Sequence, residues 1–234
     1  MTAPSLDAFF AHVGGFLEGG TGLEQLEAEF GPVGDRDGLA YYAWLVKFDQ
    51  MRILGELYPL CRTWLDRVGT PWEEVVAGFV AAHRPTGWSV PHLGEHFADW
   101  LLQQSEADPA RFPVGVEALA DLVWTRFLAR NAPDGDGLGL DRRVFVRQYR
   151  VDAVGLERAV HHDQPVAPFR KPSALLVYRH ASGTGVFSIP ASLATIALLV
   201  TEDQPGAVLP GVLGQVGAED LAQERIRLAG AGVL

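Results

Sequence analysis

Apolar positions in the first 131 residues recur three and four apart, a spacing that places side chains on one face of a helix. One such series runs from Phe9 to Leu17 and ends at a glycine-rich stretch. A longer series from Tyr42 to Trp64 contains Pro59, which is expected to break the helix because proline lacks the backbone donor. Further helices are expected after Thr70, over Pro91–Gln104 and over Val116–Asn131. The pattern therefore predicts an N-terminal part that is helical throughout.

The residues Thr70, Pro71 and Glu73 form a helix start with three agreeing signals. Threonine is a preferred capping residue, proline suits the first helical turn, and glutamate stands where a capping box requires it. We therefore expect the side chain of Thr70 to cap the helix that follows.

The last third of the chain changes from helical spacing to short runs with the composition of strands. Leu175–Arg179 and Val186–Ile189 are β-branched and aromatic runs separated by Ser182–Gly185, which is typical of a β-hairpin. Val144–Val151 also has the composition of a strand. Helical segments are expected at Asp152–Val160, Ser192–Val200, Ala207–Val216 and Ala218–Ala229. A hairpin followed by three short helices is the order of a winged-helix-like module.

The boundary between the two halves is expected at Pro133–Gly139, where three glycines and a proline in seven residues cannot continue a helix. We predict a helical partner-docking domain over residues 1–132, a linker over 133–141 and a winged-helix-like peptide-recognition domain over 142–234. The predicted fold class is α+β, with an all-helical domain followed by a domain that holds a small antiparallel sheet.

Composition and charge narrow the classes of function. The 234 residues carry a formal charge of −10, which argues against nucleic acid as the main partner because phosphate contacts need a basic surface. The single cysteine, Cys61, cannot form an internal disulfide, which fits a reducing compartment. No basic residue precedes the first apolar positions, so no signal peptide is expected, and the apolar run Ile189–Val200 is shorter than the ~20 residues of a membrane span. We therefore expect a cytoplasmic protein that binds no membrane.

Two histidine motifs raise the possibility of metal chemistry. His92, Glu95 and His96 fit H-x-x-E-H, the inverted zinc-peptidase motif, although the sequence identifies no third zinc ligand. The adjacent His161 and His162 point in different directions on a helix end. No nucleophile elbow, phosphate-binding glycine loop or dinucleotide fingerprint occurs in the sequence. We expect no catalytic residue, metal or cofactor in this chain, with a zinc peptidase kept as an alternative.

A DNA-binding transcriptional regulator is a further alternative, because winged-helix modules often bind DNA. From Pro165 to Leu234 the chain has five basic and five acidic residues, so this region carries no net positive charge. The helix in the position of a recognition helix carries Glu219, Asp220 and Glu224 beside Arg225 and Arg227. Its first turn would meet phosphates with negative charge, which disfavours this alternative.

Several segments of the chain carry a resemblance to a known family. They are Tyr41–Trp64 with its Tyr58-Pro59 pair, Phe79–Pro85, Pro91–Leu101, Leu119–Trp124, Ala174–Arg179 and the terminal Gly232-Val233-Leu234. Through these segments most of the chain resembles partner subunits of multinuclear non-haem iron-dependent oxidative enzymes, in which a bacterial helical domain is labelled a "DNA-binding domain". These subunits, of which the methanobactin type is one, act in the biosynthesis of ribosomally made, post-translationally modified peptides (RiPPs). The C-terminal part is also similar to a peptide-recognition element of the PqqD type.

The resemblance implies a function without catalysis in this chain. It implies a heterodimer with a TIM-barrel multinuclear iron-dependent oxidase, which would hold the iron. It also implies that the chain binds the leader of a precursor peptide as an extra strand on the edge of the C-terminal sheet. Trp88 stands in a loop between glycine and serine, where an exposed tryptophan can anchor an interface. The expected partner interface is Trp88, His92 and Tyr58, and the expected peptide-binding residues are Tyr178, Val186, Phe187, Ser188, Ile189, Leu221, Arg225 and Leu228.

Overall fold

The structure is a computed structural model, and the chain forms two compact units, Met1–Glu117 and Ala118–Leu234. Each unit is described by itself. The description covers residues 6–17, 22–32, 34–83, 93–133, 143–166, 171–183, 185–203 and 211–234, without the side chains of residues 6–11. The chain is mostly helical with one small antiparallel sheet, which confirms the α+β class.

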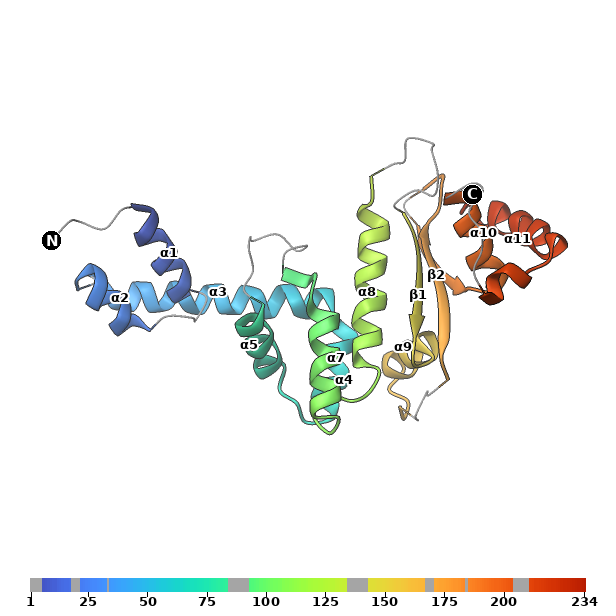
Figure 1. Ribbon diagram of the computed structural model, residues 1–234. Coiled ribbons are helices and arrows are strands. Elements are labelled where there is room, and N and C mark those ends of the chain that lie inside the picture. The colour runs from blue at the N-terminus through green and yellow to red at the C-terminus, as the bar shows by residue number, and fades with distance from the viewer. Residues whose placement is uncertain are drawn as a thin grey trace. The chain divides into compact units, whose positions relative to one another are not determined.

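The first unit contains only helices among its described residues (Figure 1). These helices are α1 (Leu6–Leu17), α2 (Leu23–Phe30), α3 (Arg36–Leu57), α4 (Pro59–Arg67), α5 (Trp72–Ala82), α7 (Phe97–Ala107) and the beginning of α8 (Val116–Asn131). The expected break at Pro59 is confirmed, since α3 ends before Tyr58 and α4 begins at Pro59. None of the helices in the described part of the chain is long and apolar enough to cross a membrane.

Aromatic rings fill the core of the first unit around Phe97, which is fully buried. Its ring centroid lies 4.7 Å from that of Tyr58, 5.0 Å from that of Phe79 and 5.8 Å from that of Trp72. Tyr58 is fully buried as well, and its hydroxyl donates to the carbonyl of Gly94 at 2.8 Å. Trp72 and Phe79 pack edge to face on Phe97, and Tyr58 lies tilted against it, so this cluster joins the junction of α3 and α4 to α5 and α7.

The start of α5 differs from the expected capping arrangement. Pro71 is the N-cap residue and makes no side-chain capping bond. The hydroxyl of Thr70 instead donates to the carbonyl of Arg111 at 2.6 Å, and Thr70 is buried. Thr70 therefore serves a long-range contact, because a buried hydroxyl needs a hydrogen-bond partner wherever the fold places it.

The second unit is built on a three-stranded antiparallel sheet of order β1-β2-β3, formed by β1 (Val144–Tyr149), β2 (Ser173–Arg179) and β3 (Val186–Pro190). The expected hairpin and the expected strand after Val144 are both confirmed. The remaining elements are α9 (Ala153–His161), α10 (Leu193–Asp203), the 3₁₀ helix η1 (Gly211–Gln215) and α11 (Ala218–Gly230). Of the expected helix at Ala207–Val216, residues 207–210 lie outside the described part of the chain.

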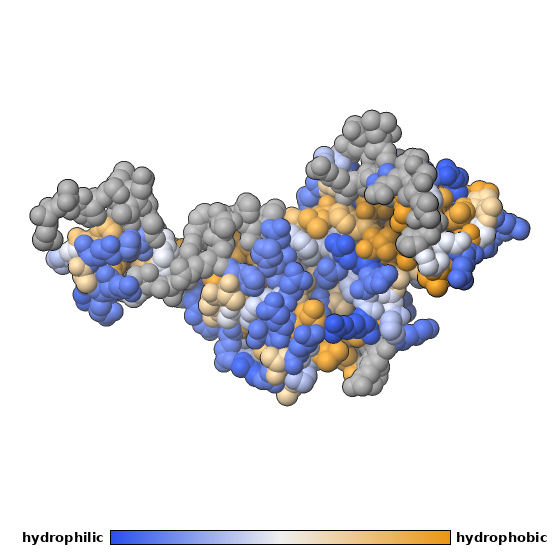
Figure 2. Space-filling view, in the orientation of Figure 1, coloured by the Kyte–Doolittle hydropathy of each residue, from blue (hydrophilic) through white to orange (hydrophobic). Residues whose placement is uncertain are grey.

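The two faces of the sheet carry different helices (Figure 1). On one face, α8 contacts β1 through polar groups: Tyr149 donates to Asp121 at 2.9 Å and Arg147 donates to Thr125 at 3.0 Å. On the other face, Leu176 packs with Leu228 of α11 in a hydrophobic cluster. The other buried members of this cluster are Tyr178, Leu198, Leu199 and Val233. Apolar residues also gather over the sheet and the C-terminal helices on the face shown in Figure 2.

Helix α8 lies almost entirely in the second unit, whereas its apolar pattern groups it with the preceding helices in the sequence. The physical reason is the set of hydrogen bonds that Asp121 and Thr125 make with β1. The expected linker at 133–141 lies outside the described residues except for Pro133.

Candidate functional site

The strand β3 is an edge of the sheet, since it pairs with β2 alone in the described part of the chain. The amide of His180 bonds to the carbonyl of Gly185 at 2.9 Å, and the amide of Ala191 bonds to the carbonyl of Ala174 at 2.8 Å. Hydrogen-bonded pairs alternate along an antiparallel ladder, so Phe187 and Ile189 also bond inward to β2. Val186 and Ser188 consequently direct both their N–H and their C=O groups away from β2.

Pro190 ends this free edge. Its register partner is Leu175 in a pair that does not exchange hydrogen bonds, so its missing N–H faces away from β2. An edge strand is one of the few places in a sheet where proline is tolerated. The edge therefore offers a short segment, centred on Val186 and Ser188, for pairing with another strand.

The opposite edge of the sheet is β1. The amide of Arg179 bonds to the carbonyl of Arg143 at 3.1 Å, which places Phe145 and Arg147 in hydrogen-bonded pairs with β2. Val146 and Gln148 therefore direct their backbone groups outward. The sheet thus has two edges, β1 and β3, among the described residues.

On the face of β3 toward α8, Ser188 is the polar side chain, and it stands between Val186 and Pro190. Arg126 of α8 donates from Nε to the hydroxyl of Ser188 at 3.0 Å. Its other two nitrogens hold both carboxylate oxygens of Glu157 of α9, one of them at 2.9 Å. A bidentate arginine–carboxylate pair is the strongest of the common ion-pair geometries. A strand added beside β3 would meet Ser188 and this ion pair on the α8 side.

The side chains of β3 that face the C-terminal helices are apolar. Phe187 is 48% exposed and stacks on Tyr178, with ring centroids 5.7 Å apart. Ile189 is half-buried and packs against the hydrophobic cluster. Ser188 is thus a single polar position on an otherwise apolar edge, so an added strand with a polar side chain beside Ser188 and apolar side chains beside Phe187 and Ile189 would match it.

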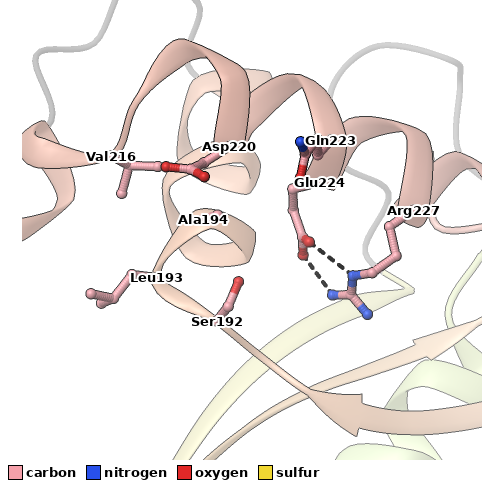
Figure 3. Close-up of a pocket in the computed structure, with 8 residues that line it drawn as sticks. All are labelled: Ser192, Leu193, Ala194, Val216, Asp220, Gln223, Glu224 and Arg227. Carbon is pink, nitrogen blue, oxygen red and sulfur yellow. Dashed lines mark hydrogen bonds and ion pairs between the residues drawn. The ribbon is translucent and has the colours of Figure 1, made fainter.

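A cavity of about 620 Å³ opens between α10 and α11, close to the end of β3 (Figure 3). Ser192, which follows Pro190 by two residues, begins its lining, and Leu193 supplies an exposed apolar side chain. Its complete lining is Ser192, Leu193, Ala194, Val216, Asp220, Gln223, Glu224 and Arg227. The recess therefore has both apolar and charged walls.

The charges in this cavity are centred on Glu224, which is buried (Figure 3). Arg227 donates to its carboxylate from Nε at 2.8 Å and from a terminal nitrogen at 2.5 Å. The buried hydroxyl of Thr195 also donates to Glu224. The hydrogen bonds from Arg227 hold the pKa of Glu224 below its ordinary value, against the opposing effect of burial. The pair is therefore fully charged at neutral pH, which leaves Asp220 as a second negative charge in the lining.

The structure places the predicted peptide-binding residues in three environments. Val186, Phe187, Ser188 and Ile189 form the edge strand itself. Tyr178 of β2 and Leu228 of α11 are buried in the hydrophobic cluster, and Leu221 of α11 packs against it, so these three join the sheet to α11. Arg225 is exposed and forms an ion pair with Glu202 of α10.

The predicted partner-interface residues are not brought together as a described surface. Tyr58 is a core residue, as its burial and its bond to Gly94 show, so its side chain is not available to a partner. Trp88 and His92 lie outside the described residues. Periodicity alone cannot distinguish a buried tyrosine from an exposed one on the same helix face.

The described residues of the two histidine motifs do not form a set of ligands for a metal ion. Glu95 and His96 are exposed, and the ring of His96 lies 5.4 Å from that of His83. His161 and His162 are exposed at the end of α9. No group of three His, Cys, Asp or Glu side chains suitable for a metal ion occurs in the described part of the chain.

Sequence reasoning missed Arg126, Glu157 and Glu224 as parts of this region. Arg126 and Glu157 are 31 residues apart and meet only because α8 and α9 lie on the same side of the sheet. Glu224 and Arg227 are three apart on one helix, a spacing that indicates an ion pair from sequence alone. No sequence pattern indicates that Glu224 is buried or that it accepts a hydrogen bond from Thr195.

Comparison with models of protein families gives no match for this chain, and a search of curated proteins gives none either. The features of this chain that bear on function are therefore the edge strand and the cavity.

Proposed function

We propose that this chain is a non-catalytic partner subunit that binds the leader of a ribosomally synthesised precursor peptide along β3. It then presents the peptide to a TIM-barrel multinuclear iron oxidase, and the iron belongs to that partner enzyme. The observation that supports peptide binding is the edge of β3, where Val186 and Ser188 direct backbone groups outward next to a cavity. Strand addition to such an edge is a general mode of peptide recognition.

The winged-helix-like architecture belongs to the same proposal. We base this assignment on the order of elements, in which the β2–β3 hairpin is followed by α10, η1 and α11. In this arrangement the hairpin presents its outer strand while the helices pack against one face. The apolar cluster around Leu176 and Leu228 supplies that packing.

The energetics require contributions from side chains as well as from the backbone. Two residues with outward N–H and C=O groups allow four main-chain hydrogen bonds, each worth about 0.5–1.5 kcal/mol net. Ordering a flexible peptide costs a comparable amount. Specific binding therefore depends on the apolar side of β3 at Phe187, on the polar side at Ser188 and on the cavity.

The experiment that tests this proposal is calorimetry with the leader peptide encoded beside this chain, using proline at Ser188. Ser188→Pro removes an outward N–H but no hydrogen bond between β2 and β3, so binding should be lost while the circular dichroism spectrum is retained. Ser188→Ala keeps the N–H and removes only the bond from Arg126, so it should weaken binding far less. Absence of leader binding by the wild-type chain, both alone and with the iron oxidase, would overturn the proposal.

A matched control uses the other edge of the sheet. Gln148 is exposed on β1 and also directs its N–H outward, so Gln148→Pro tests whether proline on any free edge disturbs binding. Binding should survive this change. Loss of binding in Gln148→Pro with full retention in Ser188→Pro would assign the peptide to β1 and contradict the proposal for β3.

The salt dependence of binding distinguishes the DNA-binding alternative from the proposed peptide binding. Both arginines of α11 are already held in ion pairs, Arg225 with Glu202 and Arg227 with Glu224. Peptide binding through backbone hydrogen bonds should vary only mildly with salt. Binding of duplex DNA that falls about 10³-fold or more between low and moderate salt would favour a regulator instead.

A further inference from the structure

The cavity between α10 and α11 has an apolar wall and a charged one (Figure 3). Leu193 and Val216 belong to the apolar wall, and the side chain of Leu193 is 53% exposed. Asp220 and the ion pair of Glu224 with Arg227 supply the charges. The volume of about 620 Å³ falls within the roughly 300–1,000 Å³ of ordinary ligand pockets. The cavity can therefore hold a long side chain that is apolar along its stem and charged at its end.

One negative charge in this lining is not neutralised. Arg227 and Thr195 donate to both carboxylate oxygens of Glu224. By contrast, no side chain in the described part of the chain forms a hydrogen bond or ion pair with the carboxylate of Asp220. Residues 204–210, which lie outside the described part, include no charged residue in the sequence. Asp220 therefore gives the lining a net negative charge.

The segment that builds the cavity is acidic as a whole. From residue 181 to residue 234 the sequence holds five acidic residues but only two basic ones, Arg225 and Arg227. Both arginines are already held in ion pairs, Arg225 with Glu202 and Arg227 with Glu224. An excess of three negative charges remains in this segment. A positively charged group is therefore attracted to the cavity, and an anion is repelled from it.

The cavity begins where the free edge of β3 ends. The amide of Ala191 still bonds to β2, at 2.8 Å, and Ser192 is the first residue of the lining. Ile189 and Ala191 both pack against the hydrophobic cluster, on the same face of the sheet as Phe187. A strand added beside β3 would place its alternate side chains opposite these three residues, on this face. The side chain opposite Ala191 would therefore lie next to the cavity.

We propose that this cavity binds a lysine or arginine side chain of the leader, with Asp220 as its counter-ion. The inference rests on the proposed function, because it takes the leader to lie along β3. The leader residues opposite Phe187 and Ile189 are then apolar, and the basic residue is the one opposite Ala191. Its aliphatic stem packs on Leu193 while its charged end meets Asp220. The leader thus carries two apolar residues and one basic residue at alternate positions.

Other classes of side chain fit this lining less well. A carboxylate would meet both Asp220 and Glu224 with like charge. An apolar side chain would displace water from Asp220 without replacing its hydrogen bonds, which costs free energy. A basic side chain replaces those hydrogen bonds and neutralises the charge at the same time.

The first test is calorimetry with a synthetic peptide of the leader encoded beside this chain. Asp220→Asn should weaken binding about fivefold, the effect of a partly exposed ion pair. Asp203→Asn makes the same change at an exposed position of α10 outside the lining, so it should leave the affinity unchanged. Equal affinities of Asp220→Asn and the wild-type chain would overturn this inference and leave the proposed function standing. Absence of binding by the wild-type chain would overturn both.

The second test exchanges the two charges. Glutamate in place of the basic leader residue should weaken binding to the wild-type chain, and Asp220→Lys should weaken binding of the natural leader. The two changes together restore opposite charges and should recover most of the affinity. Asp220 stands in the first turn of α11, where an acidic residue favours the helix dipole, so circular dichroism has to show that Asp220→Lys is folded. With both proteins folded, a combination that binds no better than either single change would contradict the pairing with Asp220.

Discussion

Arg126 connects the edge strand to two helices, because its Nε donates to the hydroxyl of Ser188 at 3.0 Å while its terminal nitrogens hold Glu157. One guanidinium thereby joins α8, α9 and β3. This connection fixes the polar side of the edge on which peptide binding is proposed. It also makes Arg126 a residue whose loss affects the stability of the whole second unit.

Replacing Arg126 by methionine should destabilise the second unit. The change keeps an apolar stem but leaves the partly buried carboxylate of Glu157 without its bidentate partner. A hydrogen bond to a charged group contributes about 1.5–3 kcal/mol, and we expect a loss of this size in the free energy of unfolding. Urea denaturation measures it. Arg52→Met, which removes exposed ion pairs with Asp49 and Glu56 on α3, should cost clearly less because exposed pairs contribute little, and equal losses for both variants would contradict this ranking.

The ion pair of Glu224 should make stability depend on pH in the acid range. The pKa of Glu224 is lowered in the folded chain by Arg227, so its contribution is complete above the ordinary value of 4.5 and is lost as pH falls through the lowered value. Glu224→Gln should therefore flatten the stability profile below pH 4.5. The test is to measure thermal unfolding of the wild-type protein and of the Glu224→Gln variant at a series of acid pH values. Parallel profiles for the two chains would show that the pair contributes nothing.

Tyr58→Phe should destabilise the first unit and leave peptide binding unchanged. The variant keeps the aromatic ring against Phe97 but leaves the buried carbonyl of Gly94 without its donor at 2.8 Å. The expected loss is about 1–2 kcal/mol in the free energy of unfolding. Tyr42→Phe removes an exposed hydroxyl from α3 and should change stability little. A larger effect at position 42 than at position 58 would contradict the burial argument.

Arg143→Met should loosen the C-terminal residues. The buried guanidinium of Arg143 donates to the carbonyls of Arg179 at 2.6 Å, Gly232 at 3.2 Å and Val233 at 3.0 Å. Because methionine offers no donor, we expect a loss of about 2–3 kcal/mol and faster amide exchange near Val233. Hydrogen exchange measured by mass spectrometry distinguishes local loosening from global destabilisation. Unchanged exchange of the C-terminal peptide would refute the role of Arg143 as an anchor.

Local signals in the sequence predicted the local parts of the fold. Pro59 marks the break between α3 and α4 because a proline cannot donate within a helix. The two β-branched runs on either side of Ser182–Gly185 pair as expected, since a short connection leaves few other partners. The edge position of β3 follows from the pairing of β1 with the other side of β2.

The remaining features depend on contacts between distant segments. The burial of Tyr58 is set by α7 and by Gly94, 36 residues away in the sequence. The ion pair of Arg126 with Glu157 forms only after the helices have packed on the sheet. Local sequence signals favour Thr70 as a helix cap, but its hydroxyl instead donates to the carbonyl of Arg111. In each case tertiary packing overrides or adds to a local preference, which a single sequence does not reveal.

The burial of Cys61 in the first unit has a practical use in spectroscopy. It is the single cysteine of the chain, its sulfur faces the carbonyl of Val116 at 3.7 Å, and burial raises the pKa of its thiol well above the ordinary range. A thiol that is neither exposed nor ionised reacts slowly with maleimides. A cysteine introduced at exposed Phe187 would therefore take up a fluorophore or spin label selectively in the native chain. Peptide binding along β3 could then be monitored by this probe.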